Sequence, residues 1–202
     1  MKHLPLLALT TLLLSSLTGC INHGSYRYGG AFPNVQLPAE GKTIGMLDPR
    51  GAYGDERARD LLQSMVKKAF GKCPGTVLLT EDELNAKAQL PAIFGDQLSD
   101  GNLDWFVENT ELDYLVVADV GPGSFEKGPI SPVAVLADRQ ASTVITVYDL
   151  ADGGPLKSIA VTGSLLLDPD GKIWELEASE TSIGYRSLRK GLKRLGKYSD
   201  CR

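Results

Sequence analysis

The sequence predicts an α/β (α+β) fold, a single domain in which helices pack on a mixed sheet as a two-layer or three-layer sandwich. Three observations predict it. Residues 114–118 are an apolar run without alternation, which is typical of a strand in the centre of a sheet. Two strand-like runs flank the turn at residues 149–155, and two long segments have the apolar periodicity of amphipathic helices. The composition, with 43% hydrophobic and 23% charged residues, is that of a globular protein.

The folded part begins with a strand and a helix. Residues 43–48 are a short apolar run that ends before Pro49, so they predict a strand. Asp55 is the expected cap of the following helix, and Gly71 is its expected end. The helix predicts one buried face, made of Ala58, Leu61, Leu62, Met65, Val66 and Ala69.

Shorter elements follow in the middle of the chain. Residues 76–80 predict a second strand, and residues 81–88 predict a short helix. Residues 98–108 predict another helix, which opens at residue 99 or 100. The central strand at residues 114–118 comes next. Strands that alternate with helices in this way are typical of a sheet covered by helices.

A hairpin and a helix end the predicted fold. Residues 143–149 and 157–167 predict the two arms of a β-hairpin with a longer loop. The second arm has one apolar face and one more polar face, as antiparallel strands often have. Ser179 is the expected cap of a C-terminal amphipathic helix over about residues 180–198. Its apolar positions are Tyr185, Leu188, Leu192 and Leu195.

The first residues have the features of an export signal. A positive end at residues 1–3 precedes an apolar run at residues 4–17, and small residues follow it. About fourteen helical residues span roughly 20 Å at about 1.5 Å each, which is too short for a hydrocarbon core of about 30 Å. We therefore expect a secretory signal, and the alternative is a short membrane anchor.

Residues 17–20, with the sequence Leu-Thr-Gly-Cys, resemble a bacterial lipobox. The resemblance implies that Cys20 carries fatty-acyl chains such as palmitate and becomes the first residue after cleavage. It also implies the outer membrane, because Ile21 and not an aspartate follows the cysteine. Several acyl chains hold a protein to a membrane far more firmly than one. We expect a lipid-anchored protein that faces the periplasm.

Three segments follow from this cleavage. Residues 1–19 are the expected signal peptide, residues 20–40 the lipidated cysteine with a flexible tether, and residues 41–202 the periplasmic α/β domain. Residues 21–40 contain three glycines, two prolines and no hydrophobic periodicity, which is typical of a tether. We expect the aromatic residues in this segment to fold back onto the domain or to lie at the lipid surface, and the alternative is that they contact a partner.

Cys73 and Cys201 are the two thiols that remain after lipidation. In an exported domain, two cysteines most often pair. We expect a disulfide between the end of the first long helix and the end of the last. It would contribute roughly 4–5 kcal/mol in the chain-entropy model. The alternative is two free buried thiols.

Histidine is almost absent from the mature chain. The full sequence contains only His3 and His23; His3 lies in the expected signal peptide, and His23 lies three residues from the lipidated cysteine. A nucleophilic triad needs a histidine on the folded domain, and so does a histidine zinc site. We therefore expect a protein that is not an enzyme and that has no catalytic residues, metal site or cofactor. A site made of carboxylates alone, as in glycosidases, stays open as an alternative.

Residues 168–171, Asp-Pro-Asp-Gly, offer a further alternative. They match part of a calcium loop, but the rest of the pattern is missing, and a turn between strands is the simpler interpretation. Residues 41–43, Gly-Lys-Thr, lack the glycine that a phosphate-binding loop needs five residues earlier, so no nucleotide site is expected.

The charges are unevenly distributed. The formal net charge is −4, which argues against a sequence-independent nucleic-acid binder. Residues 95–120 contain seven acids and no base, whereas residues 186–202 contain seven bases and one acid. A solvated face, with bases that complement a helix dipole, is the ordinary interpretation. The alternative is a contact between copies or with an anionic partner in the envelope.

The order of the elements over residues 41–202 resembles a known family. The strand, helix, strand, hairpin and closing helix, with Asp152, Gly153 and Gly154 in the hairpin turn, are similar to one periplasmic domain. That domain is shared by the curli-secretion-channel lipoprotein and the lipoprotein activators of penicillin-binding proteins. The resemblance implies a non-enzymatic, envelope-anchored binding or assembly role. It does not extend to a membrane-crossing hairpin, and it supplies no catalytic residues.

We therefore predict an outer-membrane lipoprotein that binds an envelope protein or associates with itself. Two alternatives remain: a hydrolase of envelope polysaccharide that uses carboxylates, and a lipoprotein that binds a small ligand or a metal.

Overall fold

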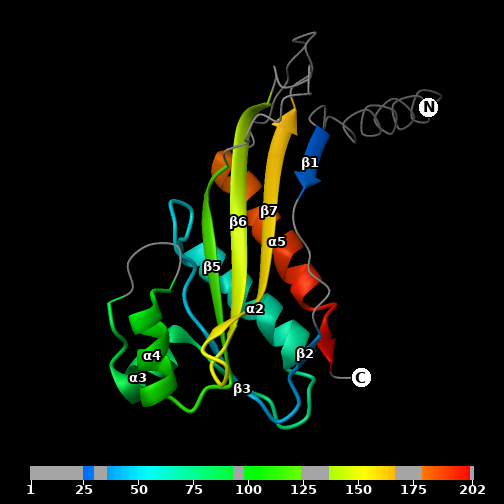
Figure 1. Ribbon diagram of the computed structural model, residues 1–202. Helices are drawn as coiled ribbons and strands as arrows, with labels where there is room; N and C mark the ends of the chain where they lie inside the picture. The colour runs from blue at the N-terminus through cyan, green and yellow to red at the C-terminus, as the bar shows by residue number, and fades with distance from the viewer. Residues whose placement is uncertain (1–24, 30–35, 93–97, 124–136, 167–178, 201–202) are drawn as a thin grey trace, which may run out of the picture.

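The computed structural model describes residues 25–29, 36–92, 98–123, 137–166 and 179–200. Its main feature is one six-stranded sheet in the order β1–β7–β6–β5–β3–β4 (Figure 1). The strands are β1 (Ser25–Gly29), β3 (Thr43–Met46), β4 (Val77–Leu79), β5 (Tyr114–Pro122), β6 (Ala137–Asp149) and β7 (Gly154–Leu166). Strand β3 pairs in parallel with β4 and β5, and the other pairs are antiparallel. The mixed sheet is thus confirmed.

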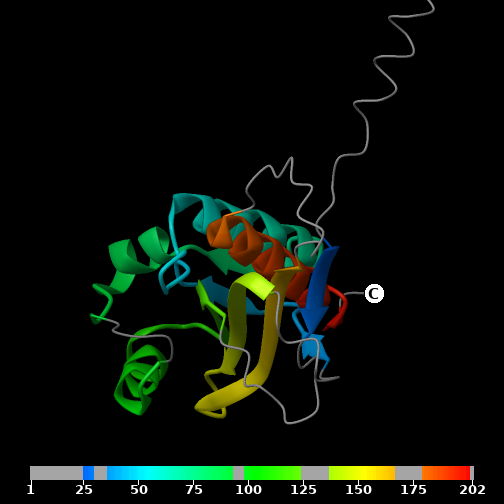
Figure 2. The ribbon, with the colours of Figure 1, turned by 90° about the horizontal axis from the view of Figure 1, so that it is seen from above.

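Four helices pack on this sheet in the described part of the chain. They are α2 (Glu56–Phe70), α3 (Glu81–Ala88), α4 (Asp100–Asn109) and α5 (Glu180–Leu195). Figure 2 shows α2 and α5 side by side on one face, with α4 on the other. The predicted helices and strands are therefore present, and the predicted α/β class is confirmed.

Two hydrophobic cores lie on the two faces of the sheet. The first joins the sheet to α2 and α5, and its helical residues include Leu62, Val66 and Leu188. The second joins the sheet to α3 and α4 through Leu84 and Phe106. Alternate residues of β5 point into the two cores, so the strand is buried on both faces over Tyr114–Ala118, as its apolar run predicted. This end of the sheet has three layers.

The sequence-predicted caps begin three of the helices. Asp55 Oδ1 accepts a hydrogen bond of 3.0 Å from Ala58 N, and Ser99 and Ser179 cap α4 and α5 in the same way. The last helix ends at Leu195, where Gly196 follows, and not near residue 198 as expected. The amide of Gly196 donates to Leu192 O, which closes the final turn.

Close packing of α5 on the sheet depends on small residues. A Cβ atom on Gly191 would lie 2.6 Å from Ile145 Cδ1 and 3.4 Å from Val161 Cγ2. No side chain separates the helix backbone from the sheet at this point, so the helix approaches β6 and β7 closely.

The segment expected to be a flexible tether contains structure. Strand β1 extends the sheet beside β7, with Ser25 opposite Leu166 and Gly29 opposite Thr162. A second, two-stranded sheet pairs β2 (Leu37–Pro38) with β8 (Ser199–Asp200). The prediction of a tether is therefore wrong for these two strands. Their pairing partners lie far away in the sequence, and local composition does not reveal such partners.

Candidate functional site

The sequence-predicted site residues lie mostly outside the described residues. Cys20, Cys201, His23 and the turn at residues 168–171 all do. Cys73 is described, and it is 4% exposed at the border of the first core. Its pairing with Cys201 and the lipidation of Cys20 therefore stay predictions.

The loop that follows β3 carries a polar cluster. Glu81, the first residue of α3, accepts two hydrogen bonds of 2.9 Å from Arg50 Nη2 and one of 2.7 Å from the amide of Asp48. Arg59 of α2 lies 3.6 Å from the Asp48 carboxylate and 3.5 Å from Glu56. Glu81 thus joins the start of α3 to the loop between β3 and α2.

Burial and the neighbouring Glu81 carboxylate raise the pKa of Asp48 above its ordinary value. Asp55, which caps α2, also accepts a hydrogen bond from the Tyr185 hydroxyl of α5. That bond is the largest cause that lowers the pKa of Asp55. A small cavity of about 330 Å³ lies here, lined by Asp48, Gly54, Asp55, Glu56 and Arg59. Each of the three carboxylates that line this cavity already has a partner: Asp48 and Glu56 form ion pairs with Arg59, and Asp55 accepts hydrogen bonds.

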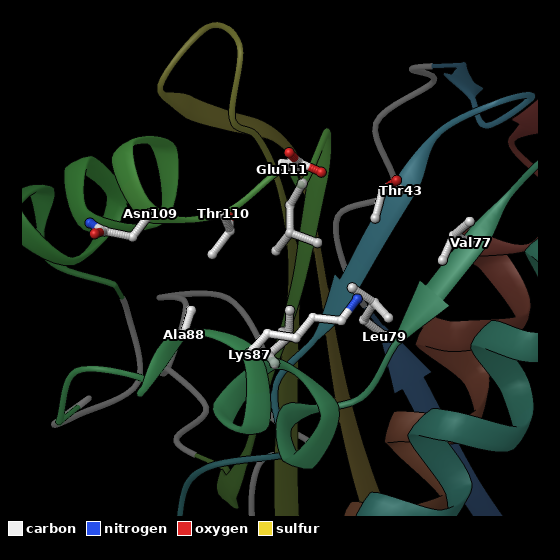
Figure 3. Close-up of a pocket in the computed structure, with 10 residues that line it drawn as sticks. Thr43, Val77, Leu79, Lys87, Ala88, Asn109, Thr110 and Glu111 are labelled. Atoms are coloured by element: carbon white, nitrogen blue, oxygen red, sulfur yellow. The ribbon is translucent and has the colours of Figure 1, made fainter.

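A second pocket, of about 380 Å³, lies beside the edge strand β4. Its floor is apolar, with Leu79, Leu84 and Leu112, and Val77 on its border is 48% exposed. Figure 3 shows Lys87 extending from α3 across the pocket, with Glu111 on another side. The volume of this pocket lies at the lower end of the range for small-ligand sites, and five of its ten lining residues are polar.

Negative charge gathers on the α3 and α4 side of the sheet. Six exposed acids form what we call the acidic lobe: Asp82, Glu83, Asp100, Asp104, Glu108 and Glu111. Lys87 is the only base in the described residues of 81–113. None of the six acids forms an ion pair with another residue of the described ranges. Their charge is therefore presented to the solvent.

Positive charge gathers on the opposite side, on α2 and α5. These helices run parallel: Asp55 and Tyr185 meet near their starts, and a Cβ atom on Gly196 would lie 3.2 Å from Ala69 Cβ near their ends. Six exposed bases on and just beyond the two helices form what we call the basic face: Lys67, Lys68, Lys72, Arg189, Lys193 and Lys197. None of them forms an ion pair within the part of the chain that the structure describes.

Clusters of metal ligands and membrane-spanning helices are both absent from the described residues. Among them, no group of three or more histidine, cysteine, aspartate or glutamate side chains is placed to hold a metal ion. No helix there combines the length and the apolar character that crossing a membrane requires.

Sequence reasoning noted both charge runs but missed their arrangement in space. The acids and the bases lie on opposite faces because α3 and α4 cover one side of the sheet while α2 and α5 cover the other. The pocket beside β4 was also missed, because its floor joins residues from β4, α3 and the segment before β5.

Comparison with known proteins yields structural similarity only. No protein-family model matches the sequence, and no curated protein sequence matches it. The L103M PelC dodecamer from Paraburkholderia phytofirmans is similar at 13% identity and a TM-score of 0.43, over 85% of this chain and 96% of that chain. Lipoprotein GNA1162 from Neisseria meningitidis is similar at 14% identity and a TM-score of 0.36, over 69% and 88%.

A putative lipoprotein from Caulobacter crescentus is similar at 11% identity and a TM-score of 0.31, over 75% of this chain and 85% of that chain. Two of these three structures are thus described as bacterial lipoproteins. Because all three TM-scores lie below 0.5, the similarities carry no argument about function. The resemblance to the curli-channel and activator family stays a prediction.

Proposed function

We propose that this protein is an outer-membrane lipoprotein that faces the periplasm and acts as a non-enzymatic assembly component of the cell envelope. In this proposal copies of the chain join to one another, with the acidic lobe of one copy against the basic face of the next. The anchor is the acylated Cys20.

The separation of charge across the sheet carries this proposal. The acidic lobe and the basic face each present six charges that have no ion-pair partner within the described ranges. Opposite potentials of this kind guide association and fix the orientation of the partners. A single copy cannot bring the two surfaces together, because the sheet lies between them.

The geometry also favours one kind of assembly. A contact between two different surfaces is heterologous, so each copy keeps one free surface of each kind. Repetition of such a contact gives a closed ring or an open chain and not a simple two-fold dimer.

Mass measurement of the mature, acylated protein in a non-ionic detergent tests the proposal. At low salt we expect particles larger than a dimer, and at high salt we expect smaller ones, because salt screens exposed charges. Cross-linking in intact cells is the second test. Recovery of the monomer alone in both experiments would contradict the proposal.

The pocket beside β4 supports a second candidate function, the binding of a small ligand with an apolar body and a carboxylate. Leu79, Leu84 and Leu112 would contact the apolar part, and the Lys87 ammonium would pair with the carboxylate. Octanoate is a suitable probe. We expect it to raise the melting temperature of the parent and to have a smaller effect on Lys87→Gln. A melting temperature that octanoate leaves unchanged would contradict this candidate.

A further inference from the structure

The position of β1 bears on how the domain stands at a membrane. Strand β1 starts at Ser25, beside the last residue of β7, at the upper end of the sheet in Figure 1. Only five residue steps separate Ser25 from Cys20. At about 3.3–3.6 Å per residue, this segment reaches at most about 16–18 Å. Acyl chains on Cys20 would therefore hold the upper end of the sheet close to the lipid.

Without β1 the restraint would be much looser. Among the described residues, the next paired one is Leu37, whose amide donates to Tyr198 O at the lower end of the molecule. Seventeen steps from Cys20 to Leu37 would reach about 56–61 Å. Pairing of β1 with β7 thus shortens the connection more than threefold and moves its attachment from the lower end to the upper end.

We propose that β1 docks the domain with the upper end of the sheet against the lipid surface and the lower end pointing away from it. This rests on the proposed function, which supplies the acyl anchor and covers the basic face with a neighbouring copy. The lower end carries the turn between β6 and β7, the β4 pocket and the C-terminal ends of α2 and α5. The binding surfaces near that end are then presented to the periplasm.

The distance between the two ends is large enough to measure. Pro122 is exposed at the upper end, opposite Ala141 of β6, and Asp152 is exposed in the lower turn. The eight steps of β6 from Ala141 to Asp149 alone span roughly 26 Å at about 3.3 Å each. A fluorescent amino acid at Pro122 or at Asp152 therefore reports on opposite ends of the molecule.

The experiment uses acylated full-length protein in vesicles of phosphatidylethanolamine and phosphatidylglycerol that contain an energy-acceptor lipid. We expect more energy transfer from the probe at Pro122 than from the probe at Asp152. Equal transfer from the two positions, or more from Asp152, would overturn the proposal. The double variant Tyr26→Pro/Arg27→Pro, which removes two β1 amides, should lose most of the difference, whereas Tyr26→Ala/Arg27→Ala should keep it.

Two controls separate the possible failures. Mass spectrometry of the purified protein reports the acyl chains on Cys20, and their absence would contradict the proposed function itself. Acylated and self-associated protein with the wrong order of energy transfer would overturn only the docking. A proline variant that folds, as circular dichroism reports, and keeps the full difference would show that β1 does not set the orientation, which would also overturn the proposal.

Discussion

Replacement of Glu81 by glutamine tests the polar cluster after β3. The Glu81 and Arg50 side chains are 22% and 30% exposed, so water screens their ion pair only in part. The amide of glutamine can still accept from Asp48 N, but the charge that faces Arg50 is lost. A hydrogen bond to a charged group contributes about 1.5–3 kcal/mol net, so we expect Glu81→Gln to lower the free energy of unfolding by about 2 kcal/mol.

That loss corresponds to a decrease in melting temperature of roughly 4–8 °C for a domain of this size. Urea unfolding gives the free energy, and calorimetry gives the melting temperature. The same substitution removes the like charge that raises the pKa of Asp48, so carbon-detected NMR should show that pKa moving down. Glu108→Gln is the matched control, because Glu108 is exposed and has no ion pair in the described residues. Equal stability of the two variants would refute the reasoning.

Three further predictions concern the pH dependence of stability, two glycines and the disulfide. The pKa of Asp48 is raised in the folded state, so its contribution to stability is present below its ordinary pKa and is lost as the pH rises through the raised value. Asp48→Asn should therefore lose less stability than the parent as the pH rises above about 4. Parallel curves of the free energy of unfolding against pH would contradict this. Gly54→Ala would place a Cβ atom 2.3 Å from a backbone carbonyl oxygen and should lower the free energy of unfolding by about 1–3 kcal/mol. At Gly101 nothing lies within 4 Å of the added Cβ atom, so Gly101→Ala should raise the free energy of unfolding by about 0.5–1 kcal/mol. Chemical denaturation compares the two variants, and equal effects would contradict the steric argument. Thiol labelling of the mature protein should find no reactive thiol before reduction and two after it, and two reactive thiols before reduction would contradict the bridge between Cys73 and Cys201.

Local patterns predicted most of the elements. The apolar stripe of the first long helix places Ala58, Leu62 and Val66 in the core, where the structure buries them, and Leu61 packs against the core partly buried. The caps at Asp55, Ser99 and Ser179 were visible for the same reason: a helix start depends on residues within one turn. These features are local, so the sequence contains them directly.

Features that depend on pairing between distant segments were not predictable. Strand β1 is only five residues long, and its partner β7 begins 129 residues after Ser25. The β2–β8 pair joins the start and the end of the described domain in the same way. The two charged surfaces were visible as charge runs, but their positions on opposite faces depend on which side of the sheet each helix covers. The two strands in the expected tether and the placement of the charged surfaces therefore could not be predicted from local patterns.

A charge-exchange experiment tests the proposed assembly most directly. One variant, Lys67→Glu/Lys68→Glu/Lys193→Glu/Lys197→Glu, leaves the basic face with four acids and two bases. The other, Asp100→Lys/Asp104→Lys/Glu108→Lys/Glu111→Lys, leaves the acidic lobe with four bases and two acids. Sedimentation at low salt measures the mass of each variant and of an equal mixture. We predict that each variant alone is monomeric and that the mixture recovers particles larger than a dimer, because each reversed surface then meets an opposite one. Variants that keep the parent's mass, or a mixture that stays monomeric, would contradict the account.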